Sequence, residues 1–170
     1  QTEIENPSLS FQQNEISLYD REVTMDRMSH IHYRLGLSTN GLYVAYGMLE
    51  RYLAKNQLPK SKLKLYACTA IFIGSKIEDY LPPKVRDVIK LADHCWDPSD
   101  KSFTARELFE AQVDLINSID FDATFGTPLF YLTQLMRISG QTQEKLLLAR
   151  YILEIMQTDQ RFIGMRYSME

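Results

Sequence analysis

Apolar residues recur every three or four positions along most of this 170-residue chain, which is the period of an amphipathic α-helix. No segment alternates between apolar and polar residues with turn dipeptides at its ends, as the strand of a hairpin does. The pattern therefore predicts an all-α fold. Seven helices are expected, at about 18–35, 38–55, 59–75, 82–92, 104–119, 127–136 and 142–156.

Residues with known preferences for helix ends support these boundaries. Gly36 can take the left-handed conformation that ends a helix, and Gly140 stands at the equivalent place after the sixth helix. Pro59 is suited to the first position of the third helix. Thr104 and Glu107 have the spacing of a capping box, which marks the start of the fifth helix.

The third predicted helix is apolar or small on every side from Leu65 to Ser75, so other helices have to surround it. Burying its large apolar residues contributes roughly 1.5–3 kcal/mol each. Its small residues, Ala67, Ala70 and Gly74, allow neighbouring helices to come close. We therefore expect this helix at the centre of the fold.

The helices divide into one complete set and one partial set. The first five, within 18–125, suffice for a domain built around the central helix, and residues 1–17 are expected to be an extended or disordered lead-in. From 126 to 170 the pattern begins again but provides only two helices. Because two helices cannot bury their own apolar faces, we expect the second set to be truncated and the natural chain to continue past Glu170.

Composition and charge narrow the class of partner. Hydrophobic residues make up 45% of the chain and charged residues 24%, as in a soluble globular protein, and no apolar run is long enough to span a membrane. The net charge of −3 disfavours nucleic acid as a partner, and Lys60, Lys62 and Lys64 are expected to be solvated at a helix start. Two cysteines cannot make a disulfide framework, and they indicate a reducing compartment, the cytosol or nucleus.

The residues with catalytic or metal-binding potential do not form a recognisable site. His30 and His32 are two positions apart on a predicted helix and point to nearly opposite sides, so they cannot share a metal. His94 and Cys95 lack a second ligand pair, and Trp96 after them is expected to be a packing anchor. No glycine-rich phosphate loop is present. We therefore predict no enzyme activity, metal or cofactor.

Six segments in order make the stretch from Leu18 to Pro128 resemble the cyclins, the regulatory subunits of cyclin-dependent kinases. The resemblance implies a five-helix cyclin box at 18–125 with a buried third helix, and the start of a second, incomplete cyclin fold at 126–170. The segments are Leu-Ser-Thr-Asn-Gly-Leu-Tyr-Val-Ala from Leu37, Leu-Glu-Arg-Tyr-Leu from Leu49, Lys-Leu-Lys-Leu from Lys62, Ile-Gly-Ser-Lys-Ile-Glu-Asp-Tyr-Leu-Pro-Pro from Ile73, Ile-Asp-Phe-Asp from Ile119 and Thr-Pro from Thr127.

The resemblance also implies a kinase-binding surface. In the family a lysine ending the third helix and a glutamate on the fifth bind backbone groups beside the kinase's mobile C-helix; here the two positions hold Lys76 and Gln112, and the neutral Gln112 is a weaker acceptor. From spacing alone, the neighbouring isoleucines could instead be core residues and Lys76 a solvated helix end. The predicted kinase-binding residues are Ile73, Lys76, Ile77, Gln112, Ile116 and Phe121.

Two further family features concern the first helix. A buried arginine–acid pair would join Arg21 to Glu50, although Arg21 could also be a solvated surface residue. The apolar substrate-docking patch of many cell-cycle cyclins is missing, because only one of its four positions is apolar. Those positions hold Asp20, Val23, Thr24 and Arg27.

The function that the resemblance implies is to bind a cyclin-dependent serine/threonine kinase as a heterodimer and activate it, in the nucleus and cytoplasm, with ATP and magnesium belonging to the kinase. The segments at Leu49 and Ser75 favour a cell-cycle type over a transcriptional type. The alternative is a cyclin-fold adaptor or a transcription-type cyclin that scaffolds partners without activating a cell-cycle kinase.

Overall fold

The computed structural model of the chain describes residues 13–123, 125–159 and 161. These residues form helices and no strand, so the all-α prediction is confirmed. The elements are α1 (Leu18–Leu35), α2 (Thr39–Lys55), the short 3₁₀ helix η1 (Lys60–Lys62), α3 (Leu63–Glu78), α4 (Val85–Cys95), α5 (Ala105–Ser118), α6 (Pro128–Ile138) and α7 (Gln143–Thr158).

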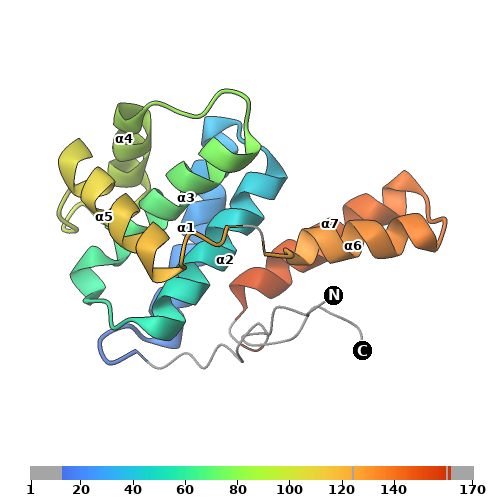
Figure 1. Cartoon of the computed structure of the whole chain (residues 1–170), viewed down its shortest axis with the longest axis horizontal. Coiled ribbons are helices and arrows are strands. Elements are labelled where there is room, and N and C mark those ends of the chain that lie inside the picture. Colours follow the sequence, from blue (N-terminus) through green and yellow to red (C-terminus); the bar gives the residue numbers. More distant parts are fainter. Residues whose placement is uncertain (1–12, 124, 160, 162–170) are drawn as a thin grey trace.

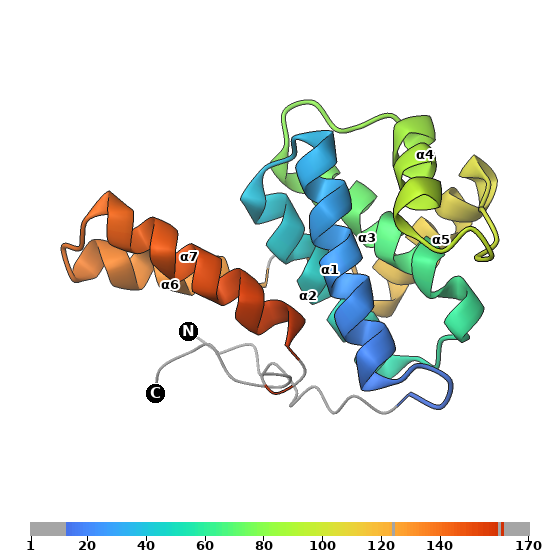
Figure 2. The same cartoon turned by 180° about the vertical axis from the view of Figure 1, so that it is seen from behind.

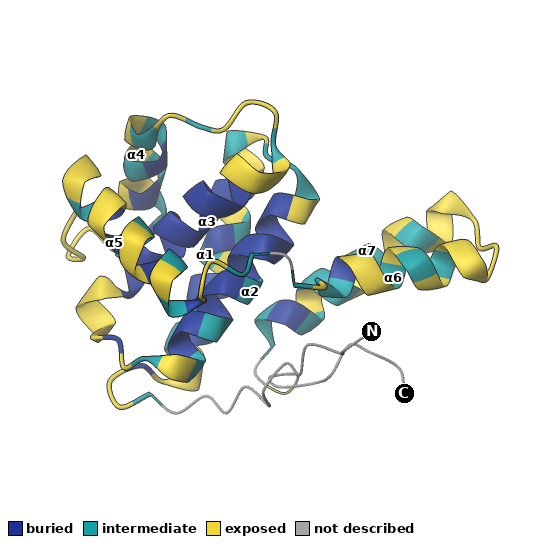
Figure 3. Ribbon diagram, in the orientation of Figure 1, coloured by how far each residue is buried: buried dark blue, intermediate teal, exposed yellow. Residues whose placement is uncertain are grey.

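Helix α3 lies at the centre of the fold and contacts α1, α2, α4 and α5 (Figures 1 and 2). It is buried over most of its length, from Leu63 to Ser75, and only its last turn emerges (Figure 3). Helices α6 and α7 pack against each other and project to one side, with α7 touching α1 and α6 touching α2. The predicted central position of the third helix is therefore confirmed.

The predicted helix ends are formed by the residues that suggested them. Gly36 is left-handed at φ 65°, and the following Leu37 N–H donates to the His32 carbonyl at 3.3 Å, which closes α1. Thr104 and Glu107 form the capping box that opens α5. Gly140, after α6, is also left-handed, at φ 62°.

The start of the third helix differs from the prediction. Pro59 opens η1, and α3 begins only at Leu63. Lys64 is not solvated but buried, and its Nζ lies 2.8 Å from Asp93 Oδ1 on α4. The fourth helix begins at Val85, later than Pro82, and α4 continues through Cys95 into the stretch predicted as loop. The burial of Lys64 reflects its contact with Asp93, 29 residues later, which no local pattern encodes.

The end of the lead-in segment is fixed against α2. The Gln13 amide donates to the Leu53 and Asn56 carbonyls, each at 2.5 Å, and Ile16 is buried in the core. Residues 13–17 are therefore non-helical but docked. Residues 1–12, which complete the predicted lead-in, lie outside the described residues.

The α6–α7 pair leaves much of its apolar surface uncovered, as expected of two helices that cannot enclose a core by themselves. Of the two, only Leu129 and Gln157 are fully buried. The exposed large apolar residues are Phe130, Tyr131, Leu135, Ile138, Leu147, Leu148, Tyr151, Ile152 and Ile155.

Close packing of α2 on α3 depends on Gly74. A methyl group at this position would lie 2.4 Å from the Gly41 carbonyl oxygen and 3.2 Å from the Ala45 nitrogen, which are backbone atoms of α2. Gly74→Ala should therefore lower the free energy of unfolding by about 1–3 kcal/mol, although alanine has the higher helix propensity. Urea unfolding followed by circular dichroism measures this loss.

The matched control is Gly41→Ala on the facing helix. There the nearest atom to the added methyl is Asp79 Oδ2, on a side chain, at 3.2 Å, so the loss should be clearly smaller. Equal stability of Gly74→Ala and the wild type would show that the two helices can move apart without cost.

Candidate protein-docking surface

The last turn of α3 and the middle of α5 meet on the exterior of the fold. Lys76 Nζ donates to Gln112 Oε1 at 3.0 Å, which joins two residues 36 positions apart in the chain. Lys76 is exposed and Gln112 partly exposed, so the pair lies at the surface. The structure thus brings together the two polar residues that the cyclin resemblance singled out.

A hydrogen-bonded cluster on the far side of α5 fixes this helix relative to α2 and α3. The hydroxyls of Tyr52 and Tyr66 both donate to Asp114 Oδ2, at 2.6 and 2.5 Å, and their rings lie 4.7 Å apart. Burial, with the hydrogen bonds to Asp114, raises the pKa of both phenols, so they remain protonated donors. Gln112 therefore projects from a helix whose position is set by two neighbours.

The ammonium group of Lys76 rests on aromatic rings. Its Nζ is 4.1 Å from the centre of the Phe72 ring and 6.0 Å from that of Phe109, which are cation–π distances. Partial burial against these rings lowers the pKa of Lys76 from its usual value. Among the described residues Lys76 belongs to no ion pair, so its donors are held in place without a carboxylate.

Exposed apolar side chains surround the Lys76–Gln112 pair. Ile77 is 46% exposed, Phe109 47% and Val113 59%. A polar pair inside an uncovered apolar patch is typical of a surface that docks another protein. Phe109 and Val113 were not among the predicted residues, although Phe109 stands three residues before Gln112 and so extends the same helical stripe by one turn.

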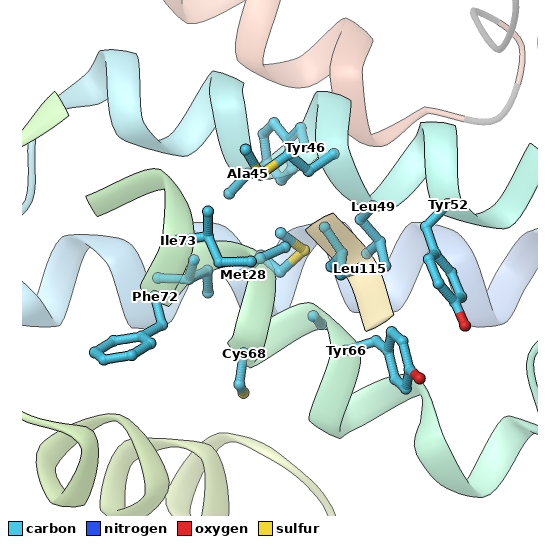
Figure 4. Close-up of a cluster of buried hydrophobic side chains, with 14 of the residues drawn as sticks. Met28, Ala45, Tyr46, Leu49, Tyr52, Tyr66, Cys68, Phe72, Ile73 and Leu115 are labelled. Carbon is cyan, nitrogen blue, oxygen red and sulfur yellow. The ribbon is translucent and has the colours of Figure 1, made fainter. Parts of the chain in front are cut away.

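Ile73 was predicted to lie on this exterior surface, and that placement is wrong. The residue is only 4% exposed, and Figure 4 shows it within the core beside Ala45 of α2. The physical reason is the path of α3, which leaves the core only after Ser75. Residues on one helical face therefore change from core to surface within a single turn, and the spacing of Ile73 and Ile77 does not reveal that change.

The other two predicted residues lie in the second half of α5 and just after its end. Ile116 is partly buried and packs against the core. Phe121, just beyond the helix, is 75% exposed, and its N–H donates to the Ile116 carbonyl at 3.0 Å. Phe121 and Asp120 both have positive φ, 58° and 55°, a conformation uncommon outside glycine. This turn ends α5 and holds the Phe121 ring in solvent.

Arg21 and Glu50 also meet, in the interior between α1 and α2. Arg21 Nε lies 2.5 Å from Glu50 Oε1, and both side chains are more than nine-tenths buried. The remaining guanidinium N–H groups donate to the carbonyls of Gln157 and Thr158 at the end of α7, at 3.2 and 3.3 Å. Burial raises the pKa of Glu50, and the adjacent Arg21 opposes the rise. One arginine thus joins three helices.

Three of the four α1 positions that would carry the apolar docking patch have structural roles instead. Asp20 closes the capping box with Ser17 and lies 2.8 Å from Lys60 Nζ. The buried Thr24 hydroxyl donates to the Asp20 carbonyl. The Arg27 guanidinium lies 5.3 Å from the centre of the Trp96 ring, and Trp96 is buried as a packing anchor. Val23 is partly exposed.

The described part of the chain contains neither a metal-binding cluster nor a membrane-spanning helix. It contains no group of three or more histidine, cysteine or acidic residues that could bind a metal ion. None of its helices is both long and apolar enough to span a lipid bilayer.

Comparison with known proteins gives a family match over most of the chain. The model of the family described as "Cyclin, N-terminal domain" matches residues 1–124. The chain is 23% identical over 164 residues to Cyclin-B2-2 of Oryza sativa subsp. indica, which covers 96% of this chain and 38% of the rice protein. It is 27% identical over 164 residues to the G2/mitotic-specific cyclin cig2 of Schizosaccharomyces pombe, with the same two coverages of 96% and 38%. The chain therefore spans less than half of these relatives.

Two solved structures share the fold. A viral cyclin from herpesvirus saimiri superposes with a TM-score of 0.68 at 21% identity, over 85% of this chain and 60% of the viral one. A chain of the yeast RNA Pol II CTD kinase CTDK-1 complex superposes with a TM-score of 0.74 at 13% identity, over 92% of this chain and 53% of that one. At these identities the likeness shows the fold alone, and it confirms the predicted cyclin fold.

The buried Arg21–Glu50 pair yields a stability prediction. Glu50→Ala should lower the free energy of unfolding by about 3–5 kcal/mol, because it leaves the Arg21 charge buried without its partner. The control is Glu110→Ala, whose carboxylate pairs with Arg106 at 2.8 Å but is 63% exposed. Exposed pairs of this kind contribute at most about 1 kcal/mol. Urea unfolding curves compare the two variants, and similar small losses would mean that solvent reaches Arg21.

Proposed function

The chain belongs to the cyclin family, whose members are non-catalytic regulatory subunits, and from that premise we propose that it binds and activates a cyclin-dependent serine/threonine kinase in cell-cycle control. The observation that carries this proposal is the Lys76–Gln112 pair within its apolar patch. The cell-cycle role is supported by relatives whose names are G2/mitotic-specific cyclins.

The proposed docking uses apolar contact for affinity and the polar pair for alignment. Ile77, Phe109 and Val113 would be buried against the kinase, and buried aromatic and aliphatic anchors contribute most of the energy of such interfaces. Lys76 and Gln112 would exchange their mutual hydrogen bond for backbone carbonyl and N–H groups beside the kinase's C-helix. Since Gln112 is neutral, its contribution is weaker than that of a carboxylate in the same position.

Activation by such docking is a shift of population in the kinase. A surface that binds the kinase better when its C-helix lies inward increases the share of that state by its difference in affinity for the two states. The inward helix completes the Lys–Glu pair that kinases need for phosphoryl transfer and helps to order the activation loop. The chain itself supplies no reacting group, and ATP and Mg²⁺ are bound by the kinase.

The experiment is affinity purification of the chain from an extract of its own source, followed by an assay of histone-kinase activity in the eluate. We expect activity with the wild type, and a loss of about tenfold or more with Lys76→Glu, since the substitution removes charge-assisted donors and places a carboxylate on the patch. The loss is read as activity per amount of chain recovered.

Lys90→Glu is the matched control, because Lys90 is exposed on α4, away from the patch, and the change in charge is identical. Its eluate should keep wild-type activity. Equal loss in both variants would show a non-specific charge effect, and an eluate without any kinase would instead favour a cyclin-fold adaptor.

A further inference from the structure

A second surface site lies between α1 and α4. Here the two helices are in contact (Figure 2). Residues of both helices line a shallow cavity of about 340 Å³. It is separate from the α3–α5 patch and has a different chemistry, since five of its six lining residues carry polar or charged side chains. The lining residues are Asp26, Arg27, His30, Arg34, His94 and Cys95.

The cavity concentrates cationic groups that the fold leaves without ion-pair partners. The buried cations Arg21 and Lys64 are paired within the chain, with Glu50 and Asp93. Neither Arg27 nor Arg34 takes part in any ion pair among the described residues. The two arginines therefore reach the same cavity with no carboxylate bound to either.

The geometry presents these groups together. Arg27, His30 and Arg34 are three and four residues apart on α1, so they share one helix face, and His94 reaches the same cavity from α4. The Arg27 guanidinium lies over the buried Trp96 ring, 5.3 Å from its centre, and this cation–π contact favours one position of the group. A planar guanidinium fixed in this way can offer two parallel N–H groups to a phosphate.

We propose that this cavity binds the phosphorylated side chain of a serine or threonine in a peptide. A phosphate monoester brings nearly two negative charges and three strong acceptor oxygens, which matches two guanidinium and two imidazole groups better than a carboxylate does. No phenylalanine, tyrosine or tryptophan lines the cavity. The Asp26 carboxylate in the lining repels a bound phosphate, so removing its charge should strengthen binding. The site acts independently of the α3–α5 patch.

The test is an NMR titration of the ¹⁵N-labelled chain with the acetylated peptide Ala-Ala-phosphoSer-Ala-Ala. Its phosphate should shift the amide signals of the α1 and α4 residues around the cavity. Arg34→Ala should weaken binding about tenfold or more, as expected for one charge-assisted contact, and Asp26→Asn should tighten it. Arg34 makes no described hydrogen bond or ion pair, so its replacement leaves the fold intact.

Arg86→Ala is the charge-matched control, because Arg86 is exposed on α4 outside the cavity and lies near Asp87. The affinity of this variant for the phosphopeptide should equal that of the wild type. Three outcomes would overturn the proposal. They are equal binding of the unphosphorylated peptide, equal affinity for inorganic phosphate alone, which would indicate a simple anion site, and an unchanged affinity of Arg34→Ala.

Discussion

The burial of α3 on nearly every side is the constraint on which the rest of the structure depends. Four helices pack around it, and the contact with α2 is so close that Gly74 faces backbone atoms directly. Since α3 is covered up to Ser75, its emergence at Lys76 is abrupt. The docking surface therefore lies where α3 leaves its neighbours. Lys76 directly follows the buried part of the helix, so its backbone is held by the packing of the core.

Local signals in the sequence were sufficient for the seven helices and for most of their ends, because caps and periodicity depend on residues a few positions apart; the start of α3 and the bounds of α4 were the exceptions. The burial of Lys64 depended on Asp93, 29 residues later, and the burial of Ile73 depended on how far α2 overlaps α3. Neither is encoded within one helix. The pairing of Lys76 with Gln112 could be anticipated only through a family pattern, since spacing alone left the same residues compatible with a plain core.

The α3–α5 patch and the α1–α4 cavity would attract a partner by different interactions. Around Lys76 a single cation rests on aromatic rings within an apolar patch, so contact with a partner is stabilised mainly by removing apolar area from water. Between α1 and α4 two arginines belong to no ion pair among the described residues, so attraction of an anion there acts over distance and weakens with salt. A protein with both surfaces can orient an approaching partner through the charges between α1 and α4 and bind it at the apolar patch around Lys76.

The contacts of Arg21 give the α6–α7 pair a mechanical property. Both helices project from the domain, yet the last carbonyls of α7 accept hydrogen bonds from the same guanidinium that pairs with Glu50. The projecting pair is thus anchored at its base by two hydrogen bonds from a buried charged group. Detaching α7 would leave these guanidinium N–H groups without acceptors, which is costly for a buried charge, so the end of α7 should stay attached to the domain.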